Sequence, residues 1–306
     1  MAKITGTASS DILAGTMLQD LIMGLESDDT LNGDDGDDEI RGGEGNDSIA
    51  AGNGNDMLFG GYGDDLLNGN AGDDMLYGSS GNDSLYGEDG NDLLSGGSGN
   101  DRMDGGDGAD TIEGGAGDDV ITGGAGDSVV GGSGFDTIQY SAAASGVSVD
   151  FSTHTVSIGG VAGTVDGVEA ITGSAFNDIL SGDSGANELF GGAGADMIRG
   201  RAGADILTGG KGADTFMYMQ KDVIANGVHQ GLDTITDFRT NDHIDLRDFF
   251  KTGAPSNADD AIHMTFDGTN TTLAVLNGGA FVDVANLAGD FSAPASFFIE
   301  GNMILV

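Results

Sequence analysis

Aspartate recurs at every ninth residue through the first part of this chain. Thirteen nonapeptides follow one another without a break from Gly6 to Thr122, and the sixth residue of each is an aspartate. Carboxylate oxygens held at a fixed interval are suited to binding a hard divalent cation such as Ca²⁺. These units contain no histidine or cysteine, which argues against zinc or copper.

Two other positions complete the repeating unit. The eighth residue is large and apolar in all thirteen units, from Leu13 to Ile121. The first residue is glycine in every unit except at Ala51, and the fourth is glycine from Gly36 onward. The unit is therefore G-x-x-G-x-D-x-U-x, where U is apolar, and a fixed period of this kind indicates stacked structural repeats.

The pattern predicts how each unit folds. Glycine permits the positive φ angles of a tight turn, and the alternation of a strand turns position 8 inward while positions 7 and 9 face outward. We expect a turn of about six residues and a strand of about three in each unit. Two units then form one coil, and units n and n+2 stack on the same side.

Such a coil does not gain enough free energy to fold without a bound ion. One buried apolar side chain in nine residues is too little to offset the entropy of ordering the backbone. Stacked aspartates, such as Asp38 with Asp56 and Asp47 with Asp65, would also repel each other. The sequence therefore predicts a region that is unfolded without metal and that folds when a divalent cation lies between successive turns.

Four segments resemble a known family. "GGEGNDSIA" (42–50), "GGYGDDLLN" (60–68), "GGSGNDRMD" (96–104) and "GGAGDDVIT" (114–122) are similar to RTX, or haemolysin-type, calcium-binding repeats. The resemblance implies an all-β chain with a right-handed parallel β-roll (β-helix) solenoid in two arrays, a β insert between them and a β-rich C-terminal cap. It also implies that position-6 aspartates of two stacked turns and backbone carbonyls hold each ion, with roughly ten Ca²⁺ ions in all.

The resemblance implies the following ligands. The side chains are Asp38, Asp47, Asp56, Asp65, Asp74, Asp83, Asp92, Asp101, Asp110, Asp119, Asp136, Asp178, Asp196, Asp205 and Asp214. The backbone carbonyls are those of Gly33, Gly42, Gly60, Gly69, Gly78, Gly87, Gly96, Gly105, Gly114, Gly191 and Gly200. Because the first three units lack glycine at position 4, we expect Asp11, Asp20 and Asp29 to belong to a cap.

The interruptions of the repeat divide the chain into five segments. They are a degenerate N-terminal cap (1–32), a first array (33–139), a β insert (140–172), a second array (173–217) and a C-terminal domain (218–306). Within the first array, the unit at 123–130 is one residue short. In the second array Asn187 replaces the aspartate, so we expect a weaker site there.

The C-terminal segment resembles a second kind of element. "DTITDFRTNDHIDLRDFF" (233–250) and the end "SFFIEGNMILV", with Glu300 before four apolar residues, are similar to the target domain of proteins exported by type I secretion. The implied partner is an ABC secretion machinery, and the implied location is outside a Gram-negative cell or on its surface. We expect no amino-terminal signal peptide, because "MAKITGTASSDILAG" has no apolar run.

Composition excludes several classes of partner. The chain has 51 acidic and 10 basic residues, a formal charge of −41, so nucleic acid and anionic membrane surfaces would be repelled. There is no cysteine for a disulfide or a thiolate site. No apolar stretch of about 18 residues could span a bilayer.

No catalytic constellation is found in the sequence. The four histidines are scattered, H-E-x-x-H is absent, and no serine lies in G-x-S-x-G. We therefore expect a protein that is not an enzyme.

An apolar set on outward positions is less expected. Met57, Phe59, Met75, Tyr77 and Leu93 occupy positions 7 and 9 of alternate units and should share one sheet face. Either the insert or the tail covers them, or they form a surface for self-association or for a partner.

Three functions follow from these features. The first is a secreted calcium-binding RTX protein with a structural or interaction role, as in a surface layer, a biofilm or host contact. The second is a targeting and folding module of an exported enzyme whose catalytic part is on another chain, although such enzymes place the catalytic domain before the repeats and here five residues precede Gly6. Ice binding is disfavoured, because position 3 carries no threonine from Ala8 to Ala116.

Overall fold

The computed structural model describes residues 1–225, 228–239, 241–250, 262–267, 269–277, 280–288, 296–299 and 302–305. It contains two compact units. The first comprises Met1–Tyr140 and Thr155–Val168, and the second comprises Ser141–His154 and Glu169–Val306. The insert predicted at 140–172 is therefore shared between the two units.

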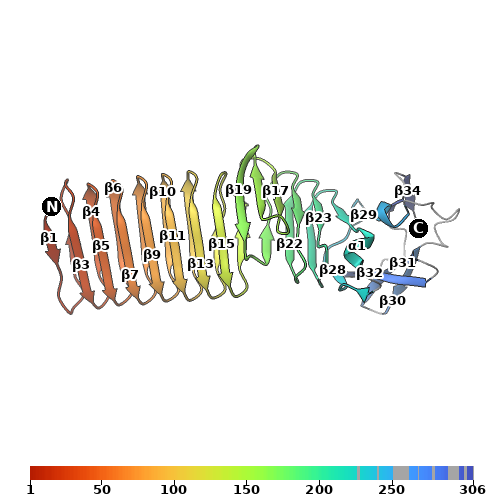
Figure 1. Cartoon of the computed structure of the whole chain (residues 1–306), viewed down its shortest axis with the longest axis horizontal. Coiled ribbons are helices and arrows are strands. Elements are labelled where there is room, and N and C mark those ends of the chain that lie inside the picture. The colour runs from red at the N-terminus through yellow and green to blue at the C-terminus, as the bar shows by residue number, and fades with distance from the viewer. Residues whose placement is uncertain are drawn as a thin grey trace. The chain divides into compact units, whose positions relative to one another are not determined.

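The first unit is a solenoid with two parallel sheets (Figure 1). One sheet contains β1 (Lys3–Thr5), β3 (Leu21–Glu26), β5 (Glu39–Glu44), β7 (Met57–Tyr62), β9 (Met75–Ser80), β11 (Leu93–Ser98), β13 (Thr111–Ala116), β15 (Ser128–Ser133) and β19 (Val161–Asp166), with β18 (Thr155–Ile158) antiparallel to β19. The other contains β2 (Ile12–Ala14), β4 (Thr30–Asp35), β6 (Ser48–Asn53), β8 (Leu66–Ala71), β10 (Ser84–Asp89), β12 (Arg102–Asp107), β14 (Val120–Thr122) and β16 (Thr137–Gln139).

The register confirms two nonapeptides per coil. Leu58 of β7 lies opposite Leu76 of β9, and Leu67 of β8 lies opposite Leu85 of β10. The prediction of three-residue strands was wrong for the first unit, because most of its strands contain six residues. The chain remains paired beyond the first glycine of the following unit, since a positive φ at position 2, +123° at Gly61, keeps positions 2 and 3 in register with the next coil.

The core is a row of position-8 side chains from each sheet. Leu58, Leu67, Leu76, Leu85 and Leu94 are all 0% exposed. Strand alternation also turns the aspartates of position 6 and the glycines of position 1 inward, on either side of this row. The aspartate columns therefore lie inside the roll.

The second unit continues the same plan with shorter strands. One sheet contains β17 (Val147–Asp150), β21 (Ile179–Ser181), β23 (Met197–Arg199), β25 (Thr215–Met217), β29 (His243–Asp245) and β33 (Ser296–Ile299), with β34 (Asn302–Leu305) antiparallel to β33. The other contains β20 (Ala170–Thr172), β22 (Glu188–Ala193), β24 (Ile206–Lys211), β28 (Asp233–Ile235) and β32 (Ala280–Ala288), followed by the antiparallel β31 (Asn270–Asn277) and β30 (Ile262–Phe266).

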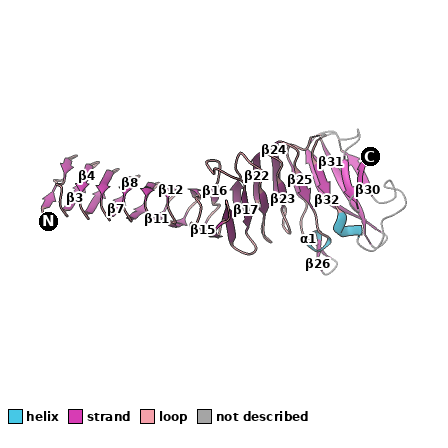
Figure 2. Cartoon of the chain, turned by 90° about the horizontal axis from the view of Figure 1, so that it is seen from above, coloured by secondary structure: helices cyan, strands magenta, loops and turns pink. Residues whose placement is uncertain are grey.

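Among the residues that the structure describes, helix is confined to two short elements of this second unit. They are α1 (Gln220–Val223), drawn in cyan in Figure 2, and a 3₁₀ turn at Arg247–Phe250. A small antiparallel pair, β26 (Ile224–Ala225) and β27 (Val228–His229), follows α1. Across the described ranges, no helix is long and apolar enough to cross a membrane. Glu300 and Val306 of the predicted secretion signal lie outside the described residues.

Candidate metal centre

The position-6 aspartates form continuous hydrogen-bonded columns. The backbone N–H of each donates to Oδ1 of the aspartate one coil later, as from Asp38 to Asp56 at 2.6 Å and from Asp47 to Asp65 at 2.8 Å. Two columns run through the first unit, and two more run through the second. We call each position-6 residue of a column a rung. One carboxylate oxygen of each such aspartate therefore already accepts a backbone hydrogen bond.

The second oxygen is buried and has no partner in fifteen of the described aspartates. They are Asp29, Asp38, Asp47, Asp56, Asp65, Asp74, Asp83, Asp92, Asp101, Asp110, Asp119, Asp136, Asp196, Asp205 and Asp214. The set contains every predicted side-chain ligand except Asp178. A buried carboxylate oxygen without a hydrogen bond or a cation is costly, so these atoms fit a metal ion.

Electrostatics leads to the same conclusion. Burial, with a smaller contribution from neighbouring carboxylates, raises the pKa of Asp65 and of Asp74 to about 7. Burial likewise raises the pKa of Asp83 and of Asp101 to about 6. Columns of such carboxylates are ionised near neutral pH only at a cost that a bound cation removes.

Backbone carbonyls approach the same oxygens. A Cβ atom on Gly42 would collide with Oδ2 of Asp47 and would lie 2.7 Å from the carbonyl oxygen of Gly60. The space left by the missing side chain is thus bordered by a carboxylate and a carbonyl. Other carbonyls that were predicted as ligands also lie next to a position-1 glycine. With that of Gly60, they are the carbonyls of Gly33, Gly42, Gly87, Gly96, Gly105, Gly114, Gly191 and Gly200.

Calcium suits this set of donors. Ca²⁺ accepts carboxylate and carbonyl oxygens in a flexible shell of six to eight ligands. Among the residues that the structure describes, no three His, Cys, Asp or Glu side chains converge on one point. An ion in these columns would therefore combine few carboxylates with backbone oxygens, which is the kind of ligand set that the resemblance implies.

Some rungs differ from the rest. Asp178 accepts hydrogen bonds from the N–H of Ser174 at 2.6 Å and from its hydroxyl at 2.7 Å. Asp20 accepts the N–H groups of Ala2 and Thr16, and the first of these bonds lowers its pKa. Asp29, assigned to the cap from the sequence, instead has an unpartnered buried oxygen like those of the arrays.

Three aspartates extend the columns beyond the predicted set. Asp127, in the short unit, accepts the N–H of Asp110 at 3.1 Å. Asp233 and Asp242, which follow the repeats, accept the N–H groups of Asp205 and Asp214, each at 3.1 Å. Burial, followed by the charge of Asp205, raises the pKa of Asp233 to about 8. The signal that could have located the last two is D-x-U without the glycine of position 1, as in Asp233–Ile235, which keeps Gly231 at position 4.

The apolar set of outward residues lies together on the first sheet. Met57, Met75 and Leu93 are in register on neighbouring strands. The rings of Phe59 and Tyr77 stack with centroids 5.2 Å apart at an angle of 11°. Met57 and Met75 remain 37% and 42% exposed, so the part of the insert that belongs to the first unit (155–168) does not cover them.

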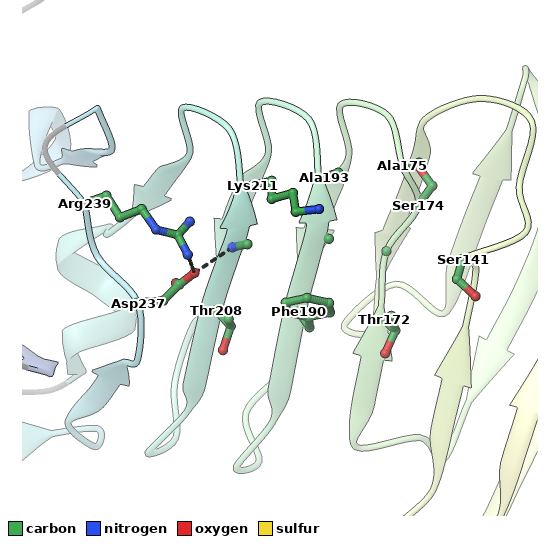
Figure 3. Close-up of a pocket in the computed structure, with 13 residues that line it drawn as sticks. Ser141, Thr172, Ser174, Ala175, Phe190, Ala193, Thr208, Lys211, Asp237 and Arg239 are labelled. Carbon is green, nitrogen blue, oxygen red and sulfur yellow. Dashed lines mark hydrogen bonds and ion pairs between the residues drawn. The ribbon is translucent and has the colours of Figure 1, made fainter.

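A groove lies on the second unit, and its lining includes Ser174, which also donates to Asp178 (Figure 3). Its volume is about 560 Å³, and Phe190 lies between Thr172 and Thr208 on neighbouring strands. Asp237 accepts the N–H groups of Gly209 and Gly210 and pairs with Arg239 at 3.2 Å. The groove therefore presents an aromatic ring, hydroxyls and basic side chains on a strongly acidic chain.

Comparison with known proteins supports calcium binding by this repeat. The family model for the RTX calcium-binding nonapeptide repeat (4 copies) matches residues 15–49, 41–76, 50–85, 68–103, 95–130, 104–138, 164–198 and 181–216, which together make up more than half of the chain. The chain belongs to this family. It is a calcium-binding repeat protein with a β-roll fold.

Two solved structures are similar to this RTX chain. A subunit of the mannuronan C5-epimerase from Azotobacter vinelandii is 30% identical, with 40% of this chain and 71% of that one covered and a TM-score of 0.34. The extracellular lipase LipA from Serratia marcescens is 19% identical, with 79% and 39% covered and a TM-score of 0.23. No curated protein matches the chain.

Proposed function

We propose that this RTX chain is exported unfolded and folds outside the cell when calcium binds its aspartate columns. The observation that carries the proposal is the set of fifteen buried aspartate oxygens without a partner. Inside a cell, where free calcium is scarce, the columns would carry unbalanced charge and the roll would not form. Outside, ion binding supplies the missing folding free energy.

The ligands proposed are the unpartnered oxygens together with the position-1 carbonyls. Bound Ca²⁺ would neutralise the carboxylates and link each coil to the next. Extracellular calcium modules bind at about 10⁻⁴ to 10⁻³ M, a range suited to a switch between the cytosol and the medium. Export by a type I machinery that recognises the C-terminal segment agrees with this order of events, because an unfolded chain can pass through a narrow channel.

Outside the cell, the folded roll acts as a structural or interaction protein. The support is the apolar face formed by the exposed Met57 and Met75 with the half-buried Phe59, Tyr77 and Leu93, since such faces mark contact surfaces. A second copy of this chain is the proposed occupant. Calcium bound in the columns lowers the net charge of −41 that would otherwise keep copies apart.

The test is a calcium titration of the full chain followed by far-ultraviolet circular dichroism. We expect little β signal with excess chelator, a cooperative gain of signal as calcium reaches the millimolar range, and no comparable gain with magnesium. Magnesium is the matched control, because it prefers rigid octahedral sites with several waters. The same β signal in chelator and in calcium would contradict the proposal.

A further inference from the structure

The nonapeptides have two kinds of rung, which differ in how the carboxylate is satisfied. In five units the position-2 N–H donates to the side chain of position 6. The pairs are Thr7 with Asp11 (2.6 Å), Thr16 with Asp20 (2.7 Å), Gly124 with Asp127 (2.6 Å), Ser174 with Asp178 (2.6 Å) and Asp183 with Asn187 (2.9 Å). We call these rungs closed, and we call the fifteen with an unpartnered buried oxygen open.

The exposed fraction of the aspartate does not distinguish open from closed rungs. Asp20 and Asp178, in closed rungs, are each 1% exposed, and Asp74, in an open rung, is also 1% exposed. The difference therefore lies in the local donor and not in access to solvent.

The sign of φ at the position-2 residue distinguishes open from closed rungs without exception. In every open unit this residue has a positive φ. The fifteen residues are Leu25, Asp34, Gly43, Gly52, Gly61, Asn70, Ser79, Glu88, Gly97, Gly106, Gly115, Gly132, Gly192, Arg201 and Gly210. Not one position-2 residue of the five closed units has a positive φ.

The physical link is the orientation of one peptide group. The angle φ is the rotation about the N–Cα bond, so it sets where the N–H of position 2 points relative to the strand that follows. With negative φ this N–H reaches the carboxylate, and with positive φ it does not. In both kinds of rung an oxygen faces the space beside the position-1 glycine, where a carbonyl of the next coil also lies, as for Asp47 with Gly60 and Asp178 with Gly191. Only the hydrogen bond from the position-2 N–H distinguishes the closed rung.

Side-chain chemistry at position 2 favours one state or the other. Threonine is β-branched and disfavours positive φ, and the hydroxyls of Thr7, Thr16 and Ser174 also donate to the carboxylates of their rungs. Glycine adopts positive φ without cost. Leu25, Glu88 and Arg201 hold positive φ despite their side chains, so packing in the coil imposes the open state there.

We propose that the backbone conformation of position 2 determines which rungs bind calcium, so that open rungs hold ions and closed rungs are metal-free ends of the columns. Asp11 and Asp20 begin the two columns of the first unit, and Asp178 and Asn187 are the first repeat rungs of those in the second. In these closed rungs the position-2 N–H takes the place of the ion. Asp29 is thereby assigned as a ligand, whereas Asp178 is not.

The assignment rests on calcium binding by the columns but not on export or on any partner. Two matched pairs of variants test it in the full chain. Asp29→Asn and Asp196→Asn change open rungs, and Asp20→Asn and Asp178→Asn make the same chemical change in closed ones. The readouts are the number of bound calcium ions from equilibrium dialysis and the calcium concentration at half-maximal folding.

We expect each open-rung variant to bind fewer ions and to need several-fold more calcium to fold. Each closed-rung variant should bind as many ions as the unmodified chain. Equal loss in both members of a pair would overturn the assignment. An unmodified chain that binds no calcium would instead overturn the proposed function, so the two failures are distinguishable.

A gain-of-site variant keeps the test informative if an asparagine variant fails to fold. Ser174→Gly removes the hydroxyl donor and permits positive φ beside Asp178. The variant should bind one more calcium ion than the unmodified chain. An unchanged ion count in a folded Ser174→Gly protein would contradict the role given to position 2.

Discussion

The backbone N–H of Asp56 donates to Oδ1 of Asp74 over 2.7 Å, across eighteen residues of sequence. The same carboxylate keeps its other oxygen buried and unpartnered. One oxygen thus holds the register of the coil and the other is left for a cation. This division of labour recurs along the columns, and it explains how one residue in nine can determine both the fold and its dependence on calcium.

Removing one carboxylate from the middle of a column should weaken folding in calcium. Asp74→Asn replaces the unpartnered oxygen by an amide, and we expect a loss of about 1–3 kcal/mol in the free energy of unfolding. The matched control is Asp73→Asn, an exposed neighbour that loses the same charge. Its effect should stay within about 0.5 kcal/mol. Urea unfolding in millimolar calcium measures both, and equal losses would contradict the special role of position 6.

Acid should partly replace calcium. The pKa values of Asp65 and Asp74 are raised to about 7 in the folded chain, whereas an unfolded aspartate titrates near 4. The folded state therefore binds protons more tightly than the unfolded state. This contribution to stability is fully present below about pH 4 and is lost as the pH rises toward about 7.

Circular dichroism in chelator across this range tests the sign. We expect the β signal of the metal-free chain to grow as the pH falls from about 7 to about 4. In a companion titration, the calcium concentration needed for folding should fall as the pH falls, because protons bind the folded chain more tightly than the unfolded chain and so supply part of the stabilisation that calcium otherwise supplies. A metal-free β signal that grows with rising pH would show that the carboxylates are not destabilised by burial.

Two neighbouring leucines offer a test of the core. Leu67 is 0% exposed and Leu66 is 44% exposed. Leu67→Ala should lower the free energy of unfolding in calcium by about 2–5 kcal/mol, because it leaves a cavity. Leu66→Ala should change it by less than about 0.5 kcal/mol. Similar losses at the two positions would indicate a different strand register.

Self-association through the apolar face can be measured directly. Phe59→Ser combined with Tyr77→Ser removes the stacked pair, which Arg41 also covers at 5.0 Å from the Phe59 ring centre. We expect a lower sedimentation coefficient in calcium for this double variant. Tyr86→Ser is the control, because Tyr86 belongs to the other sheet. If the unmodified chain already sediments as a monomer, this face does not mediate dimerisation.

The repeat was readable from the sequence because two residue types share one period. Aspartate and the apolar residue of position 8 fix the pairing of Leu67 with Leu85 and turn the carboxylates inward. The fifteen unpartnered oxygens include fourteen of the fifteen aspartates predicted as ligands, although their occupation by calcium stays a prediction.

Other features depend on local geometry that the period does not encode. The six-residue strands depend on the positive φ of position 2, which glycine permits but Leu25 and Glu88 also adopt. Asp233 and Asp242 escaped prediction because their D-x-U segments lack the glycine of position 1, and that of Asp242 also lacks the glycine of position 4. The closing of Asp178 by Ser174 depends on a single peptide orientation, and only the structure reveals it.

The most direct measurement is the calcium anomalous signal from crystals of the full chain grown in calcium. The account predicts peaks between stacked rungs, at about 2.3–2.6 Å from the free oxygens of aspartates such as Asp65, Asp74 and Asp83. Peaks confined to the exposed surface, with water or a backbone N–H bound to those oxygens, would contradict it.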